Sequence, residues 1–206
     1  MKIAVFGATG RVGSYMMTFA LEAGWQVKAL VRAPEKITQK TPQLEVIKGD
    51  VFAKHLVEKT IAGCDAVFVS LGTDKTNTLS ASAPHIVAAM KKHGVMRAVI
   101  IGTAGILDSR HQPGKYRFET PESKRKTTTA AEEHLKAFQI WKASGLEWTY
   151  VCPTYLPDGE PTGEVRCETG GLPEDGKKIT VGDTACFAFR TLHDNRFVRQ
   201  RIGICY

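Results

Sequence analysis

Three glycines near the start of the chain have the spacing of a phosphate-binding turn. Gly7, Gly10 and Gly13 follow the apolar run 3–6, and a segment with apolar residues at helical intervals comes after them. Glycine lets the backbone come close to a pyrophosphate, and the free N–H groups at the start of the following helix attract its charge. We therefore predict a strand, a turn and a helix that bind a dinucleotide. The predicted contacts are Gly7, Thr9, Gly10, Arg11 and Val12.

A basic residue ends the second predicted strand, 27–32. Enzymes that use NAD carry a carboxylate at this place, whereas this chain has Arg32, with Lys36 four residues later. A guanidinium can bind a 2′-phosphate through two hydrogen bonds, and a carboxylate would repel it. The residues therefore favour NADP(H) as the cofactor. The alternative is a solvated arginine at a strand end.

Four further apolar runs, 44–48, 65–70, 97–101 and 146–152, are predicted to be strands of the same parallel sheet. Because ligands bind beyond the carboxyl ends of such strands, the residues that follow them are candidate contacts. They are Asp50, Val51, Leu71, Gly72, Thr73, Thr103, Ala104, Pro153, Thr154 and Tyr155. Two interpretations of Asp50 remain open at this point: it accepts from the adenine amino group, or it is the N-cap of a helix.

The alternation of strands and helical segments predicts an α/β fold, a Rossmann-like doubly wound parallel sheet with helices on both faces. Predicted helices cover 55–61, 80–93, 130–143 and 182–192, and 201–205 is predicted to be a last edge strand. We expect a single NAD(P)-binding domain over 1–206 with a small C-terminal region that caps the substrate. The loops 105–129 and 155–180 are expected on the substrate side.

Composition narrows the class of protein. The net charge of +7 suggests anionic ligands, while no recognised motif indicates specific nucleic-acid binding. No apolar run is long enough to span a membrane, and we expect no signal peptide. Five dispersed cysteines fit a reducing, cytoplasmic environment. We expect a monomer or a weak homo-oligomer.

The loop 108–129 is rich in basic residues. It is either a solvated mobile loop or a lid whose cations meet an anionic substrate. The residues are Arg110, Lys115, Arg117, Lys124, Arg125 and Lys126.

Some expected catalytic groups are missing from the sequence. None of the tyrosines has a lysine four residues later, so the Tyr-x-x-x-Lys pair of many ketone reductases is absent. The histidines have no metal-ligand spacing, so no metal is predicted, and His134 is interpreted as a surface residue of a helix. A hydride acceptor that needs no strong protein acid fits better. Flavins and linear tetrapyrroles are such acceptors: both are planar, and their common forms are anionic.

Taken together, these motifs resemble the NADPH-dependent flavin reductase / biliverdin-IXβ reductase family of atypical short-chain dehydrogenase-reductases. The matching segments are 7–13, 30–32, 49–51, 71–73, 86–91, 93–95, 144–146 and 153–163. Two segments depart from the family pattern. Thr103-Ala104 replaces Thr-Ser, which removes a hydroxyl, and Pro153-Thr154-Tyr155 replaces Pro-Pro-His. The departures leave cofactor binding intact and put the identity of the acceptor in question.

The resemblance implies an NADPH-dependent reductase that transfers hydride to a flavin (FMN, FAD or riboflavin) or to a linear tetrapyrrole such as biliverdin. Thr103 and Tyr155 are the candidate catalytic residues, with Tyr155 expected to line the nicotinamide pocket rather than to donate a proton. The alternatives are a non-catalytic NADP(H)-binding redox sensor, a quinone reductase of the same fold and, on charge alone, a nucleic-acid-binding protein.

Overall fold

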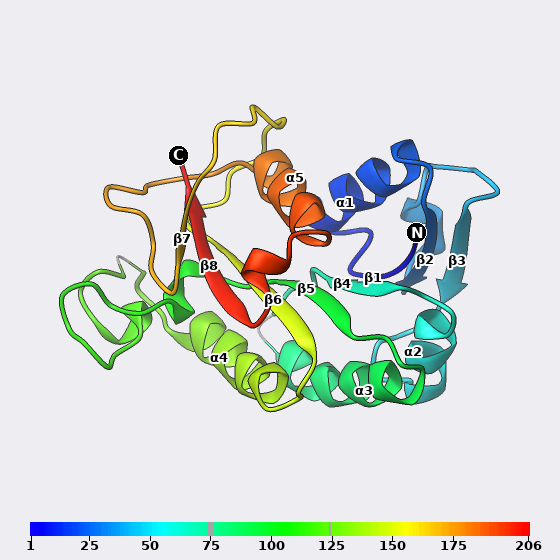
Figure 1. The fold of residues 1–206 in the computed structure, drawn as a ribbon, viewed down its shortest axis with the longest axis horizontal. Coiled ribbons are helices and arrows are strands. Elements are labelled where there is room, and N and C mark those ends of the chain that lie inside the picture. The colour runs from blue at the N-terminus through cyan, green and yellow to red at the C-terminus, as the bar shows by residue number, and fades with distance from the viewer. Residues whose placement is uncertain (74–75, 124) are drawn as a thin grey trace.

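The computed structural model describes residues 1–73, 76–123 and 125–206. Its strands form one sheet in the order β3-β2-β1-β4-β5-β6-β8-β7 (Figure 1). All neighbouring pairs are parallel except β7 and β8, which are antiparallel. The strands are β1 (Lys2–Phe6), β2 (Gln26–Val31), β3 (Leu44–Lys48), β4 (Ala66–Val69), β5 (Arg97–Ile101), β6 (Glu147–Pro153), β7 (Arg166–Thr169) and β8 (Gln200–Cys205).

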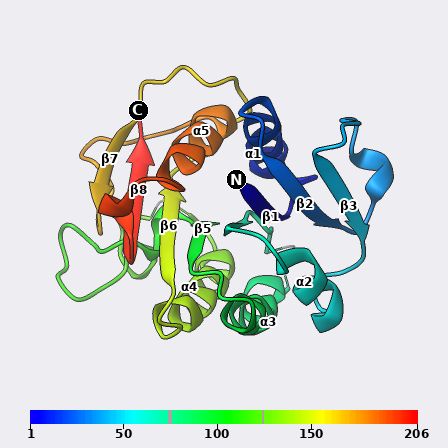
Figure 2. The same ribbon diagram turned by 45° about the vertical axis from the view of Figure 1, so that its right-hand side comes forward.

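Helices cover both faces of the sheet, which confirms the predicted Rossmann-like α/β fold (Figures 1 and 2). Alternate residues of β1 point to opposite faces: Ile3 and Val5 pack with α1 and α5, whereas Ala4 and Phe6 pack with α2, α3 and α4. The helices are α1 (Arg11–Glu22), α2 (Lys54–Ile61), α3 (Thr78–Lys92), α4 (Thr129–Lys142) and α5 (Val181–Thr191).

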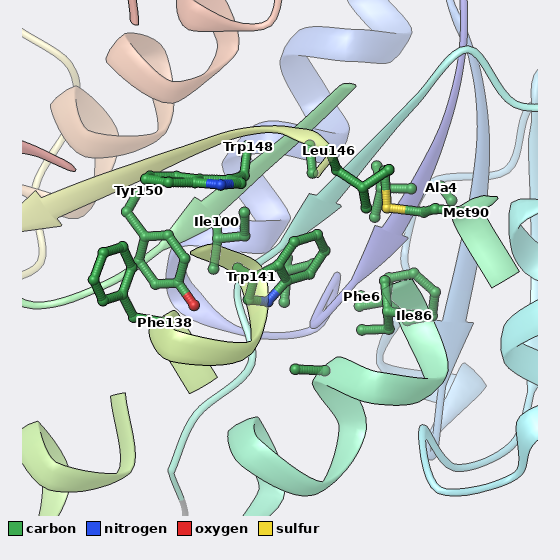
Figure 3. Close-up of a cluster of buried hydrophobic side chains, with 14 of the residues drawn as sticks. Ala4, Phe6, Ile86, Met90, Ile100, Phe138, Trp141, Leu146, Trp148 and Tyr150 are labelled. Atoms are coloured by element: carbon green, nitrogen blue, oxygen red, sulfur yellow. The ribbon is translucent and has the colours of Figure 1, made fainter. Parts of the chain in front are cut away.

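The core between the sheet and α4 is aromatic (Figure 3). Phe138 of α4 meets Trp148 and Tyr150 of β6 edge-on, with ring centroids 5.5 and 5.3 Å apart. Trp141 lies one turn further along the same helix face and is 1% exposed. These contacts fix the position of α4 against β6.

The C-terminal part of the sheet differs from the sequence-based expectation. The predicted last edge strand is β8, and it lies inside the sheet, because β7 pairs with its outer side. The edge prediction was therefore wrong. The helix predicted from residue 182 begins at Val181, and its N-cap is Thr180, whose hydroxyl accepts from the Asp183 N–H at 3.1 Å.

The loop 105–129 contains ordered structure. The 3₁₀ turns η2 (Ala104–Ile106) and η3 (Arg117–Glu119) interrupt it. Arg110 pairs with Glu168 of β7 at 2.7 Å, and Arg117 pairs with Glu122 at 2.6 Å. Two of its cations are therefore already paired with carboxylates within the protein. Lys124, which the sequence places in this basic loop, lies outside the described residues.

Candidate cofactor-binding site

A cavity of about 540 Å³ opens where the parallel strands β1 to β5 end. Its wall contains most of the residues that the sequence predicts for a cofactor. These are Gly7, Thr9, Gly10, Arg11, Val12, Arg32, Lys36, Asp50, Val51, Leu71 and Gly72. Their convergence on one wall follows from the parallel sheet, which gathers its strand ends at a single edge.

The remaining predicted residues do not line this cavity. Thr103 is the N-cap of η2, and its hydroxyl accepts from the Gly105 N–H at 3.4 Å. Tyr155 is 63% exposed. Its backbone bridges to Lys178, and its carbonyl accepts from the Ile179 N–H. Thr73, Ala104, Pro153 and Thr154 are also not on the cavity wall. A role for these residues stays a prediction.

The start of α1 suits a diphosphate. Its N-cap is Gly10, none of the described side chains caps the helix, and its first turn has no acidic residue. Gly7 has a φ of +89°, which favours glycine, and a Cβ on Gly13 would lie 2.1 Å from the Gly7 carbonyl oxygen. The turn therefore packs closely against the helix, and Gly10, Arg11 and Val12 at the start of α1 line the cavity. Because the N–H groups and the positive dipole at a helix N-terminus attract a phosphate, this wall fits the dinucleotide that the fold implies.

The cavity wall at the end of β2 is basic. Arg32 follows β2 directly and Lys36 ends the 3₁₀ turn η1 (Pro34–Lys36), and both side chains are on the cavity wall. Asp50 lies nearby and accepts from the Phe52 N–H at 2.9 Å. Ala53, not Asp50, is the N-cap of α2, so the N-cap interpretation of Asp50 was wrong.

His134 of α4 is a wall residue that the sequence interpretation placed on the surface. It lines the cavity beside Ile101 and Gly102, at the end of β5. Burial of the imidazole lowers the pKa of His134 to about 4, and the nearby Arg125 adds to the shift. The ring is therefore neutral at pH 7. Its spacing from Ala137, Phe138 and Trp141 is that of one buried helix face, and this pattern is the signal that could have located it.

Other wall residues escaped sequence interpretation because they belong to no motif. They are Phe52, Ser70, Thr78, Ile101 and Gly102. Leu156 lies within the matching segment 153–163 but was not predicted as a contact.

The segment 156–163 is held across the start of α1. Arg11 Nη1 donates to the Leu156 carbonyl at 2.9 Å and to Asp158 Oδ1 at 3.0 Å, and the Tyr15 hydroxyl donates to Glu160 at 2.7 Å. At its far end, the buried Asp183 carboxylate accepts from the N–H groups of 162 and 163, both at 2.8 Å. These contacts position Leu156 on the cavity wall.

The described residues form no group of three or more His, Cys, Asp or Glu side chains that could hold a metal ion. Within those same residues, no helix has the length and apolar character required to cross a membrane.

Comparisons with known proteins agree with this geometry. The chain is 26% identical over 173 residues to YwnB of Bacillus subtilis, an uncharacterized protein, covering 81% of this chain and 78% of YwnB. It is 27% identical over 179 residues to the (4-alkanoyl-5-oxo-2,5-dihydrofuran-3-yl)methyl phosphate reductase of Streptomyces griseus, covering 83% of this chain but 56% of that enzyme.

A solved structure from Streptococcus pneumoniae, provisionally described as an NADH-flavin reductase, matches with a TM-score of 0.81 at 23% identity. The match covers 100% of this chain and 99% of that one. At this level of identity the similarity shows the fold alone. The model of the family described as NAD(P)H-binding matches residues 7–195, and the chain therefore belongs to that NAD(P)H-binding family.

Proposed function

We propose that the protein is an NADPH-dependent reductase that transfers hydride to a flavin or to a linear tetrapyrrole. The observation that carries the NADPH preference is the pair of cations, Arg32 and Lys36, on the cavity wall at the end of β2. A 2′-phosphate at this place would meet two positive charges, and a guanidinium can bind it through two parallel hydrogen bonds.

The chain's own residues bind and orient the cofactor. The uncapped N–H groups of α1 and the Arg11 guanidinium face the diphosphate, while Arg32 and Lys36 hold the 2′-phosphate. With the diphosphate and the 2′-phosphate bound in this way, the nicotinamide lies in the part of the cavity beside Gly102, His134 and Leu156. When bound, NADPH supplies the hydride.

The acceptor is a planar molecule that delocalises the incoming charge. The neutral His134 is a poor acid, and the sequence has no Tyr-x-x-x-Lys pair to supply a proton. The exposed ring of Tyr155 lies two residues beyond β6, and it is available to stack on a flat substrate. The relatives from Streptomyces and Streptococcus are both described as reductases, which supports the reaction class.

The test is NADPH oxidation with FMN, FAD, riboflavin, biliverdin isomers and quinones as acceptors. Turnover with a flavin or biliverdin is expected, whereas turnover with quinones alone would contradict the proposed acceptor class. Losing a charge-assisted contact costs roughly 1.5–3 kcal/mol, so Arg32→Ala should weaken NADPH binding about tenfold or more and leave NADH nearly unchanged. Arg196→Ala is the matched control, because Arg196 is exposed and does not line the cavity. Equal losses for both cofactors in Arg32→Ala would refute the NADPH preference.

A non-catalytic NADP(H) sensor is the second candidate. It is favoured by the fact that neither Thr103 nor Tyr155, the two predicted catalytic residues, lines the cavity. A sensor would bind NADPH but would not oxidise it in the presence of any of these acceptors.

A further inference from the structure

A second, much smaller void lies behind the wall of the cofactor cavity. It has a volume of about 10 Å³ and lies between α3, α4 and the strands β4 to β6. Most of its lining is apolar, but four of the lining residues carry polar side-chain atoms: Ser82, His134, Trp141 and Tyr150. The indole of Trp141 can only donate a hydrogen bond. A polar void of about this size accommodates one water molecule, provided that two to four polar groups surround it.

Tyr150 is the group that most needs a partner there. Its side chain is 1% exposed, and its hydroxyl has no hydrogen-bond partner among the described residues. Figure 3 shows its ring between Phe138 and Trp141, with the hydroxyl directed away from β6. Because burial raises the pKa of Tyr150 well above the usual 10, the phenol stays protonated and can donate one hydrogen bond.

Ser82 supplies an acceptor on the opposite wall. Its hydroxyl is buried in α3 and donates to the Leu79 carbonyl at 3.4 Å. Its oxygen therefore retains lone pairs that can accept a hydrogen bond.

His134 and Ile101 line both the void and the cofactor cavity, so these two residues are part of the partition between them. The adjacent Glu133 fixes α4 at this point: its carboxylate is buried and accepts from the Ser80 N–H at 2.7 Å and from the Ser80 hydroxyl at 3.0 Å. A neutral imidazole has one N–H donor and one bare nitrogen acceptor. If one ring nitrogen accepts a hydrogen bond on the side of the void, the other ring nitrogen carries the N–H and can donate on the side of the cofactor cavity.

We propose that one water molecule in this void accepts from Tyr150 and donates to Ser82 and to the bare ring nitrogen of His134, so that the imidazole N–H faces the cofactor cavity and donates a hydrogen bond to the hydride acceptor. Three hydrogen bonds satisfy the water. The last contact rests on the proposed function, whereas the water and the tautomer do not.

The role of His134 in this arrangement is polarisation. Its N–H draws electron density toward an acceptor oxygen or nitrogen as the hydride arrives. The imidazole gives up no proton, because a neutral imidazole that loses its only N–H becomes an imidazolate anion, which is a very strong base. The proton that balances the reduction comes from solvent.

The test that is independent of turnover is the ring-nitrogen NMR spectrum of ¹⁵N-histidine-labelled protein, with His134 assigned by loss of its signals in His134→Gln. One neutral tautomer is expected at pH 7. Tyr150→Phe should shift the bare nitrogen of His134 and mix the tautomers, and Ser82→Ala gives the same test should Tyr150→Phe fail to fold. Thr191→Ala is the control and should leave His134 unchanged, because Thr191 lies in α5 on the other face of the sheet and its buried hydroxyl donates to the Ala188 carbonyl at 2.7 Å.

An imidazole protonated on both nitrogens, or His134 signals that neither Tyr150→Phe nor Ser82→Ala changes, would overturn the relay. A crystal structure should also show a water within hydrogen-bond distance of the Tyr150 hydroxyl, and a dry void would contradict the proposal.

Turnover tests the final contact. With FMN and NADPH, His134→Leu should lower kcat by about tenfold or more at an unchanged KM for NADPH, and His134→Gln, which keeps a donor, should recover part of the loss. An unchanged kcat in His134→Leu would refute the contact with the acceptor. If the wild-type protein turns over no acceptor, the proposed function fails and this contact with it, while the NMR result still decides the tautomer.

Discussion

Replacing Gly13 by alanine should separate cofactor binding from folding. A Cβ at this position would lie 2.1 Å from the Gly7 carbonyl oxygen and 2.6 Å from the Ser70 hydroxyl. The carbonyl cannot easily move, because it accepts from the Gly10 N–H at 2.9 Å and so holds the turn together. The first turn of α1 must therefore move away from the turn in Gly13→Ala.

The size of the effect follows from that contact. Bringing the new Cβ out to roughly 3 Å requires a shift of about 1 Å, and overpacking of this kind costs roughly 1–3 kcal/mol of stability. The shift also draws the helix N–H groups away from the diphosphate. Losing one charge-assisted hydrogen bond, at roughly 1.5–3 kcal/mol, corresponds to about a tenfold or greater rise in the Kd for NADPH.

Gly24→Ala is the control, because Gly24 lies just beyond the other end of the same helix. Its φ is +76° and a Cβ there would meet nothing within 4 Å. Forcing alanine into this conformation costs about 1–2 kcal/mol, a similar loss of stability with no change near the cavity.

Chemical denaturation gives the stability of each variant, and NADPH fluorescence titration gives its Kd. Both variants should be destabilised, and only Gly13→Ala should bind NADPH more weakly. Equal affinities for the two variants would refute the proposed placement of the diphosphate at the start of α1.

Three further predictions concern the segment beyond β6. Burial raises the pKa of the Asp183 carboxyl, but hydrogen bonds from Tyr206, Gly163 and Thr162 outweigh this effect and hold the pKa below 3.8. The ionised carboxylate therefore stabilises the fold above that pH, and the free energy of unfolding falls as acid protonates it. In Asp183→Asn the free energy of unfolding, measured with urea, should fall less steeply as the pH is lowered. An unchanged dependence on pH would argue against this role of the carboxylate. Asp158→Asn should tighten NADPH binding by up to about fivefold at low salt by freeing Arg11 from an exposed ion pair; unchanged or weaker binding would contradict this. Tyr155→Phe should keep most of kcat with FMN while Tyr155→Ala raises KM, and a loss of about 100-fold in Tyr155→Phe would identify the phenol as a general acid.

Local patterns were enough to predict the glycine-rich turn before α1 and the strand ends. The glycine spacing at 7–13 and the apolar runs are properties of short segments, and a parallel sheet then brings the strand ends to one edge whatever the rest of the chain does. This is why Arg32 and Lys36 could be placed beside the cavity before the structure was known.

Side-chain direction and strand order depend on contacts that are distant in sequence. Tyr155 follows β6 as expected, but its backbone pairs with residues 178 and 179, and its ring is in solvent. The edge position of β7 was missed because its exposed residues show no apolar alternation and it is held in the sheet by antiparallel pairing with β8. His134 was misplaced because it was interpreted as a single polar residue, without its helical spacing from Ala137, Phe138 and Trp141 on the buried face of α4.

The order of the strands also determines how two copies of this protein can meet. An apolar strand at the rim of a sheet invites another chain to add to it, and β8, with its buried Ile202 and Ile204, would be such a strand. The four-residue β7 pairs with the outer side of β8 and carries the charged residues Arg166 and Glu168. At the opposite rim, the short β3 carries Glu45 and Lys48. Charged, short rims at both ends oppose edge-to-edge addition of a second copy and fibrillar growth.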